Sequence, residues 1–169
     1  MRLSKSIILE GPNGAGKSYL AKLLSVHYNM SVYHAGQAPQ DNEARVMCCD
    51  EQLEWVTDGP CIIDRCTPIS DTIYQCDLDM SMKSIYQKYL DIMLPDVVLI
   101  YCNNPVGPTD KPEYPEGHYQ KICKHFTHIC SKYDDMMGVI DHFVWDKDIA
   151  SFEDLIVFID AVGGENECL

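Results

Sequence analysis

Short apolar runs alternate with longer amphipathic segments along the chain. Five runs are short and mostly apolar, which is typical of buried strands; they cover residues 6–9, 31–35, 61–64, 96–102 and 139–145. The segments between them place apolar side chains three or four positions apart, which predicts helices; these cover residues 16–28, 42–57, 68–78, 81–94, a stretch that ends near 136, and 151–162. Strands that alternate with helices predict an α/β fold in which helices flank both faces of a five-stranded parallel sheet.

The first predicted strand leads directly into a glycine-rich loop. Residues 11–18 read Gly-Pro-Asn-Gly-Ala-Gly-Lys-Ser, which matches the phosphate-binding pattern G-x-x-x-x-G-K-[ST]. Backbone N–H groups in such a loop cradle phosphate oxygens, and a strand before and a helix after it are the context that the motif needs. We expect Lys17 to reach the β- and γ-phosphates of ATP and Ser18 to bind Mg²⁺. The predicted ATP-binding residues are Asn13, Gly14, Ala15, Gly16, Lys17, Ser18 and Tyr19.

An acidic residue and a basic residue follow the third apolar run. Asp64 ends that run, where a carboxylate beside a phosphate-binding loop usually holds Mg²⁺, so Ser18 and Asp64 form the predicted metal site. Arg65 comes next, and its planar guanidinium suits the oxygens of a second phosphate. Parallel sheets bind ligands at the carboxyl ends of their strands, where these residues would meet. The predicted catalytic residues are Lys17, Asp64 and Arg65.

Length, charge and cysteine content limit the class of protein. The 169 residues suit one domain spanning 1–169. The net charge of −13 disfavours a nucleic acid polymer as partner, because phosphate backbones repel acidic surfaces. Since no apolar run reaches membrane-spanning length and no signal peptide precedes the first strand, we expect a cytoplasmic protein with no membrane partner. Nine cysteines without a C-x-x-C pair indicate reduced thiols rather than a zinc site.

Residues 64–75 read Asp-Arg-Cys-Thr-Pro-Ile-Ser-Asp-Thr-Ile-Tyr-Gln. This segment resembles the thymidylate kinase pattern Asp-Arg-[Tyr/His]-x-x-Ser-x-x-Ala-Tyr-Gln. Glu10 directly before the glycine-rich loop and the run Asp-Val-Val-Leu-Ile-Tyr at 96–101 are also similar to that family. The resemblance implies a three-layer P-loop domain of the nucleoside monophosphate kinase type, usually homodimeric. It also implies transfer of the γ-phosphoryl group of ATP, with Mg²⁺, to a small nucleotide, a (deoxy)nucleoside monophosphate.

The resemblance also suggests which residues bind the acceptor, with clear departures from the family pattern. The suggested acceptor-binding residues are Arg45, Arg65, Ser70, Asp71, Tyr74 and Gln75. By this alignment Arg45 lies near the acceptor phosphate, Asp71 near the base and Tyr74 near the sugar. Cys66 stands where the family has an aromatic residue or histidine, and one extra residue precedes Ser70. An acidic side chain near the base favours a base edge rich in hydrogen-bond donors, so thymidylate is not assumed as the substrate.

The lid expected over residues 103–136 contains no arginine. Lysines replace it, and we assign Lys111, Lys121 and Lys124 to this lid. Basic residues follow one helical face and apolar residues the opposite one; the first set is His118, Lys121, His125, His128 and Lys132, the second Tyr119, Ile122, Phe126, Ile129 and Tyr133. The basic face either closes over the phosphates or is simply solvated. A metal site from Cys123, His125, His128 and Cys130 is disfavoured because the spacing scatters them around the helix.

Two other functions fit parts of the sequence. A deoxynucleoside kinase must deprotonate a hydroxyl and needs a carboxylate just after the second strand. The chain has His34-Ala35-Gly36-Gln37 there, with Asp41 and Glu43 only later. A non-catalytic ATP-binding regulatory protein would explain the glycine-rich loop but leave Asp64, Arg65 and the segment 70–75 without a role.

Overall fold

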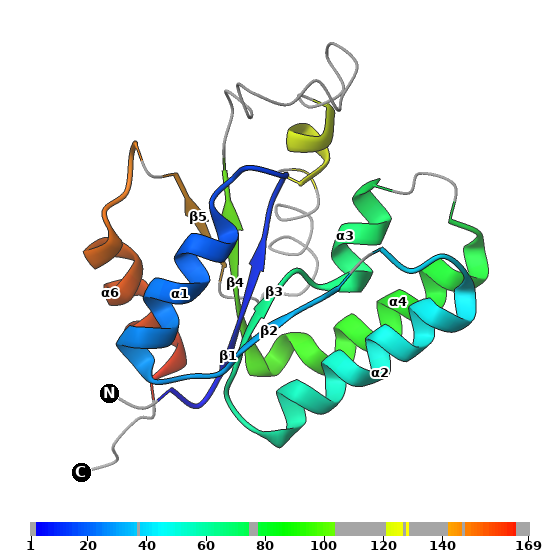
Figure 1. Cartoon of the computed structure of the whole chain (residues 1–169), viewed down its shortest axis with the longest axis horizontal. Helices are drawn as coiled ribbons and strands as arrows, with labels where there is room; N and C mark the ends of the chain where they lie inside the picture. Colours follow the sequence, from blue (N-terminus) through cyan, green and yellow to red (C-terminus); the bar gives the residue numbers. More distant parts are fainter. Residues whose placement is uncertain are drawn as a thin grey trace.

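Five strands form one parallel sheet in the computed structural model, in the order β2-β3-β1-β4-β5 (Figure 1). The structure describes residues 3–36, 38–74, 78–103, 121–126, 128, 142–146 and 148–164. The strands are β1 (Ser6–Glu10), β2 (Val32–His34), β3 (Ile62–Asp64), β4 (Val97–Cys102) and β5 (His142–Trp145). Every neighbouring pair is parallel, so the predicted five-stranded parallel sheet is confirmed.

Helices cover both faces of this sheet and make three layers. They are α1 (Lys17–Tyr28), α2 (Asn42–Asp58), α3 (Thr67–Tyr74), α4 (Met80–Met93) and α6 (Phe152–Gly163), with a 3₁₀ turn at Leu94–Asp96. In Figure 1, α1 and α6 lie on one side of the strands, and α2, α3 and α4 lie on the other. The α/β fold class predicted from the sequence is therefore confirmed.

Two apolar cores follow from the alternation of side chains along β1. Ile7 and Leu9 pack with α1 and α6 on one face, whereas Ile8 packs with α2, α3 and α4 on the other. All three are fully buried. Burial of each such side chain contributes about 2 kcal/mol, so a central strand that is apolar on both faces fixes the layering.

Capping residues set the helix boundaries close to their predicted positions. The Asp41 carboxylate accepts a hydrogen bond from the Ala44 amide (2.8 Å) at the start of α2. At the end of α2, Gly59 has a φ of +140° and stops the helix. Ser151 and Asp154 form a reciprocal capping box at the start of α6. The predicted second strand is shorter than expected, Val32–His34 rather than 31–35.

The strand register gathers the carboxyl ends of three strands at one edge. Asp64 pairs with Leu9 on one side and with His34 on the other. Glu10, His34 and Asp64 therefore end their strands beside one another, at the edge where the glycine-rich loop begins. This edge is where an open parallel sheet binds ligands.

The described part of the lid is helical over residues 121–126. Ile122 and Phe126 are buried in the core, as predicted for the apolar face of this helix. Lys121, Lys124 and His125 are exposed. Lys111 and the rest of the expected lid lie outside the described residues.

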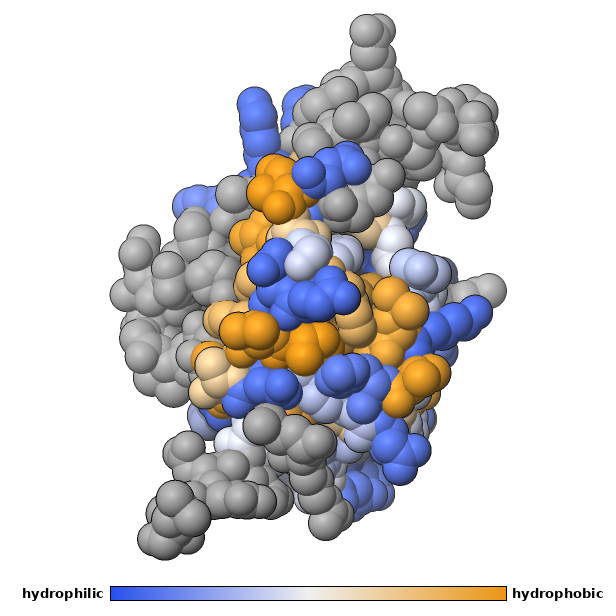
Figure 2. All heavy atoms as spheres, turned by 90° about the vertical axis from the view of Figure 1, so that its left-hand side faces the viewer, coloured by the Kyte–Doolittle hydropathy of each residue, from blue (hydrophilic) through white to orange (hydrophobic). Residues whose placement is uncertain are grey.

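The outer side of α1 and α6 carries apolar and charged side chains together. Val26 on α1 and Val157 on α6 are exposed. Figure 2 shows this side of the molecule, with apolar regions separated by hydrophilic ones. Among the described residues, no helix has the length and apolar character needed to cross a membrane.

Candidate active site

The loop after β1 begins with a glycine that has no room for a side chain. Gly11 has a φ of +143°, and a Cβ there would lie 2.2 Å from the carbonyl oxygen of Cys102. Gly14 and Gly16 are also left-handed, with φ of +79° and +81°. Gly16 caps α1, whose first helical residue is Lys17. These dihedrals expose backbone N–H groups at the start of a helix, which is the geometry of an anion site.

Lys17 lies inside the loop with little exposure to solvent. Its side chain is buried, and its Nζ donates to the carbonyl oxygens of Gly11 (2.7 Å) and Pro12 (2.8 Å). Burial, followed by the nearby charge of Arg65, lowers the pKa of Lys17 to about 8. A phosphate placed at the loop would supply negative charge to this lysine, so anion binding favours its protonated form.

Ser18, Asp64 and His34 meet at the mouth of the loop. The Ser18 hydroxyl donates to Oδ2 of Asp64 (2.7 Å), and Nδ1 of His34 lies 3.1 Å from the same oxygen. A hydroxyl and a carboxylate are the hard oxygen ligands that Mg²⁺ prefers, so this pair fits the metal expected beside phosphates. Within the described residues there is no group of three or more histidine, cysteine or acidic side chains arranged to hold a metal by themselves.

A cavity of about 460 Å³ opens over the glycine-rich loop, and we call it the loop cavity. It is lined by Gly14, Gly16, Lys17, Ser18, Tyr19, His34, Ala35, Asp64 and Arg65. Most residues predicted to bind ATP and Mg²⁺ therefore surround one space. Tyr19 is largely exposed at its rim, at 69%.

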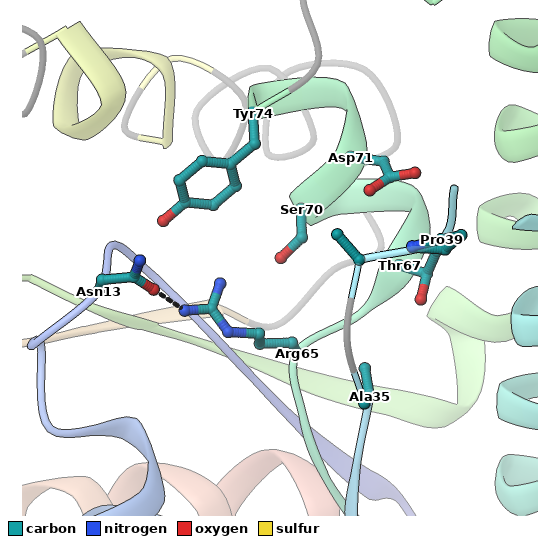
Figure 3. Close-up of a pocket in the computed structure, with 10 residues that line it drawn as sticks. Asn13, Ala35, Pro39, Arg65, Thr67, Ser70, Asp71 and Tyr74 are labelled. Carbon is teal, nitrogen blue, oxygen red and sulfur yellow. Dashed lines mark hydrogen bonds between the residues drawn. The ribbon is translucent and has the colours of Figure 1, made fainter. Parts of the chain in front are cut away.

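A second cavity of about 370 Å³ adjoins the first, and we call it the side cavity (Figure 3). It is lined by Asn13, Ala35, Gly36, Ala38, Pro39, Arg65, Thr67, Ser70, Asp71 and Tyr74. Ala35 and Arg65 line both cavities. Four of the predicted acceptor-binding residues, Arg65, Ser70, Asp71 and Tyr74, thus share this space, whereas Gln75 lies outside the described residues.

Arg65 stands at the junction of the two cavities in an unusual backbone conformation. Its φ is +82°, in the left-handed region that costs a side-chain-bearing residue about 1 kcal/mol. The guanidinium donates to the Asn13 side chain and lies 5.7 Å from the centre of the Tyr74 ring. In Figure 3 the side chain extends beneath Tyr74 toward Asn13. This places a planar cation in the wall of both cavities.

Asp71 is joined to helices α2 and α4 as well as lining the side cavity. Its Oδ2 accepts hydrogen bonds from Nε of Arg45 (3.1 Å) and from the Tyr86 hydroxyl (2.7 Å). Burial and the hydrogen bond to Asp71 raise the pKa of Tyr86, so the phenol stays protonated as a donor. The sequence suggested Arg45 as a ligand of the acceptor phosphate; the structure places its guanidinium against Asp71, which lines the side cavity.

Two buried polar residues that the sequence did not single out as site residues hold the turn after β3. Gln52 of α2 donates to the carbonyl of Arg65 (3.3 Å) and exchanges hydrogen bonds with Thr67. Glu10 is fully buried at the end of β1 and accepts a hydrogen bond from the amide of Cys66 (2.5 Å). The signal for Glu10 was its position, a carboxylate ending an apolar strand directly before the loop. Nothing local in the sequence distinguished Gln52.

The carboxylate of Glu10 touches both the loop and α3. It accepts hydrogen bonds from the amide of Gly11 (3.3 Å) and from the Ser70 hydroxyl (3.1 Å to each oxygen). Burial raises the pKa of Glu10 to about 7, although the Cys66 hydrogen bond and the charges of Lys17 and Arg65 act in the opposite direction. Ser70 therefore lines the side cavity while its hydroxyl is held by Glu10.

Comparison with known proteins identifies the fold. No protein-family model and no curated protein sequence matches the chain. The YorR protein of Bacillus subtilis, solved in complex with phosphorylated GDP, is 19% identical, with a TM-score of 0.66 over 94% of this chain and 96% of that one. A deoxyadenosine kinase from M. mycoides is 14% identical, with a TM-score of 0.59 over 93% and 98%. The thymidylate kinase of Candida albicans is 13% identical, with a TM-score of 0.58 over 94% and 92%.

These similarities concern the fold, since the identities are low. The TM-scores show that the chain shares its fold with solved structures that include a deoxyadenosine kinase and a thymidylate kinase. The chain therefore has a thymidylate kinase-like nucleotide kinase fold.

Proposed function

We propose that this chain is an ATP-dependent kinase that transfers the γ-phosphoryl group of ATP to the phosphate of a (deoxy)nucleoside monophosphate. The observation that carries the proposal is the pair of adjoining cavities with Arg65 and Ala35 in the wall of both. One cavity contains a phosphate-binding loop, and the other is large enough to bury most of a nucleotide. A cation at their junction lies where the transferred group would pass from donor to acceptor.

The loop cavity takes the donor in this proposal. Backbone N–H groups of residues 14–16 and Nζ of Lys17 bind the β- and γ-phosphates of ATP. Ser18 and Asp64 would hold Mg²⁺, which neutralises charge on the phosphates when it is bound. Lys17 must exchange its present hydrogen bonds to the Gly11 and Pro12 carbonyls for phosphate oxygens when ATP enters.

The side cavity takes the acceptor, with its phosphate at Arg65. The bond between the γ-phosphorus and the bridging oxygen of ATP breaks, and a new bond forms to an oxygen of the acceptor phosphate. ADP leaves with the electron pair of the broken bond. The acceptor oxygen is already anionic, so no strong base is needed, and catalysis consists of alignment and charge stabilisation by Lys17 and Arg65.

The rest of the side cavity is assigned to the sugar and the base. Tyr74 provides an aromatic wall against the sugar, and Asp71 provides a carboxylate toward the base. Oδ2 of Asp71 already accepts hydrogen bonds from Arg45 and Tyr86. A carboxylate accepts hydrogen bonds, so a base with a hydrogen-bond donor suits this wall better than a base edge that carries only carbonyl groups. Purines and cytosine carry an exocyclic amino group, whereas thymine does not.

Two alternatives predict different acceptors. A deoxynucleoside kinase would phosphorylate a free 5′-hydroxyl, and one solved structure with this fold is a deoxyadenosine kinase. The residues after β2 are Ala35 and Gly36, which supply no carboxylate as base. A regulatory ATP-binding protein would use no acceptor at all.

A turnover assay with every common nucleoside and its monophosphate, measured as ADP formed from ATP and Mg²⁺, tests the proposal. We expect kcat/KM for at least one monophosphate to exceed that for its nucleoside by at least about a hundredfold. Preference for nucleosides would support the first alternative, and no acceptor-dependent ADP would support the second.

We further propose that the chain is a cytoplasmic homodimer, and light scattering tests its dimeric state.

A further inference from the structure

The carboxylate of Glu10 contacts three parts of the candidate site. It receives hydrogen bonds from Gly11 in the loop, Cys66 in the turn after β3, and Ser70 in α3. The side chain is fully buried. An ionised carboxylate out of water is costly, so its place must be set by these donors and by nearby positive charge.

The turn that Glu10 holds is the one that carries Arg65. The Arg65 amide donates to the Leu9 carbonyl (3.1 Å), and the next amide, that of Cys66, donates to Glu10. The amides of Arg65 and Cys66 are therefore hydrogen-bonded to Leu9 and Glu10, two successive residues of β1. A left-handed residue persists only where its surroundings determine the backbone, and these contacts supply that constraint at Arg65.

We propose that Glu10 is a positioning residue that holds Arg65 at the junction of the loop cavity and the side cavity and so couples acceptor binding to the phosphate-binding loop. This inference rests on the proposed function for its kinetic consequence, but its structural part concerns only Glu10 and the Arg65 turn. Glu10 acts through Arg65 and Ser70 and need not touch either nucleotide.

A charge effect and a positioning effect of Glu10 predict opposite results. The charged or titratable groups that face Glu10 are Lys17 from α1, Arg65 and Cys66 from the turn, and Cys102 from β4. Removing one negative charge beside two cations makes the site more attractive to anions. If Glu10 mattered only through its charge, its neutralisation would tighten both ATP and the monophosphate.

Because the pKa of Glu10 is raised to about 7, the comparison is made at pH 8, where the carboxyl is ionised. Glu10→Gln then separates the two effects because it removes the charge at nearly constant shape. The amide oxygen can still accept from Cys66, but the amide NH₂ group then faces the N–H of Gly11, and the nearby cations Lys17 and Arg65 lose an anion that interacts with both. We expect Arg65 to move, which raises the acceptor KM about tenfold and lowers kcat, because small misplacements of a phosphate clamp are costly. ATP affinity should be unchanged or tighter.

The experiment compares wild type, Glu10→Gln and Glu54→Gln, in which the control glutamate is exposed on α2. ATP affinity is measured by calorimetry, and acceptor KM and kcat are measured with the best monophosphate from the turnover assay. A lower acceptor KM in Glu10→Gln, or acceptor KM and kcat within threefold of wild type, would overturn the proposal. If Glu10→Gln does not fold, Glu10→Asp is used instead, because it keeps the charge but moves the carboxylate away from the Cys66 amide. The same result is expected: a raised acceptor KM and a lowered kcat without loss of ATP affinity.

A second measurement does not depend on turnover. The chain has three arginines, Arg2, Arg45 and Arg65, so the Nε–Hε signals in a proton–nitrogen NMR spectrum are few and can be assigned with Arg65→Ala. We expect the Arg65 signal to shift or broaden in nucleotide-free Glu10→Gln while the Arg45 signal stays in place. An unchanged Arg65 signal would refute the positioning role. A shifted signal in a protein that phosphorylates no monophosphate would refute the proposed function and leave the positioning role standing.

Discussion

The buried carboxylate of Glu10 should make the stability of the protein fall as the pH rises from 5 to 7.5. Burial raises the pKa of Glu10 from 4.5 to about 7 in the folded chain. Between these values the folded state holds a proton that the unfolded state has released. Protonation therefore favours folding, and the stabilisation present at low pH is lost as the pH rises toward 7.

The size of this effect follows from the same pKa values. One pKa unit corresponds to about 1.4 kcal/mol, so the full loss is on the order of 3 kcal/mol. The unfolded carboxyl is already partly ionised at pH 5, which leaves a loss of about 2 kcal/mol between pH 5 and pH 7.5. Glutamine at this position does not titrate, so Glu10→Gln should lack this part of the pH dependence.

Urea unfolding of wild type and Glu10→Gln at pH 5 and pH 7.5 measures this loss of stability. The free energy of unfolding of wild type minus that of Glu10→Gln should be about 2 kcal/mol lower at pH 7.5 than at pH 5. Glu54→Gln controls for the loss of one negative charge from the net charge. A difference that stays constant within about 0.5 kcal/mol would show that the Glu10 carboxyl does not titrate as a desolvated group.

Three further substitutions test individual side chains of the site. Lys17→Ala should lower kcat at least a hundredfold, about 3 kcal/mol of transition-state stabilisation, without lowering Tm; a kcat within threefold would contradict its role at the γ-phosphate. Arg65→Ala should raise the acceptor KM and lower kcat with near-normal ATP affinity in calorimetry, and the reverse pattern would mean that the roles are exchanged. Asp71→Asn can keep an oxygen for Arg45 and Tyr86 while presenting NH₂ to the side cavity, so kcat/KM ratios among monophosphates should change about tenfold; ratios within twofold of wild type would exclude base recognition by Asp71.

The sequence was sufficient to predict the strands because the information is local. The apolar runs at 6–9 and 96–102 are short, are buried on both faces and are bounded by turn residues, so their pattern has only one good structural solution. The phosphate-binding loop was equally visible, since its glycines are required at fixed spacing by backbone geometry.

The hydrogen bonds that shape the side cavity could not be predicted in the same way. Asp71 accepts hydrogen bonds from Arg45 of α2 and Tyr86 of α4, so its environment depends on how three helices pack. Tyr86 is buried on α4, but the spacing of apolar residues along the helix gives no partner for its hydroxyl. Likewise, Glu10 meets Cys66 only because β1 and β3 are neighbours in the sheet, a relation that no local pattern encodes.

Tracing the γ-phosphate of ATP tests the central claim most directly. Radiolabelled [γ-³²P]ATP and Mg²⁺ would be supplied together with equal concentrations of a nucleoside and its monophosphate, and the products separated by chromatography. We expect the label in the β-phosphate of a nucleoside diphosphate, with little in the monophosphate. Label found mainly in the monophosphate, or released only as inorganic phosphate, would contradict the proposal that the two adjoining cavities hold ATP and a phosphate acceptor.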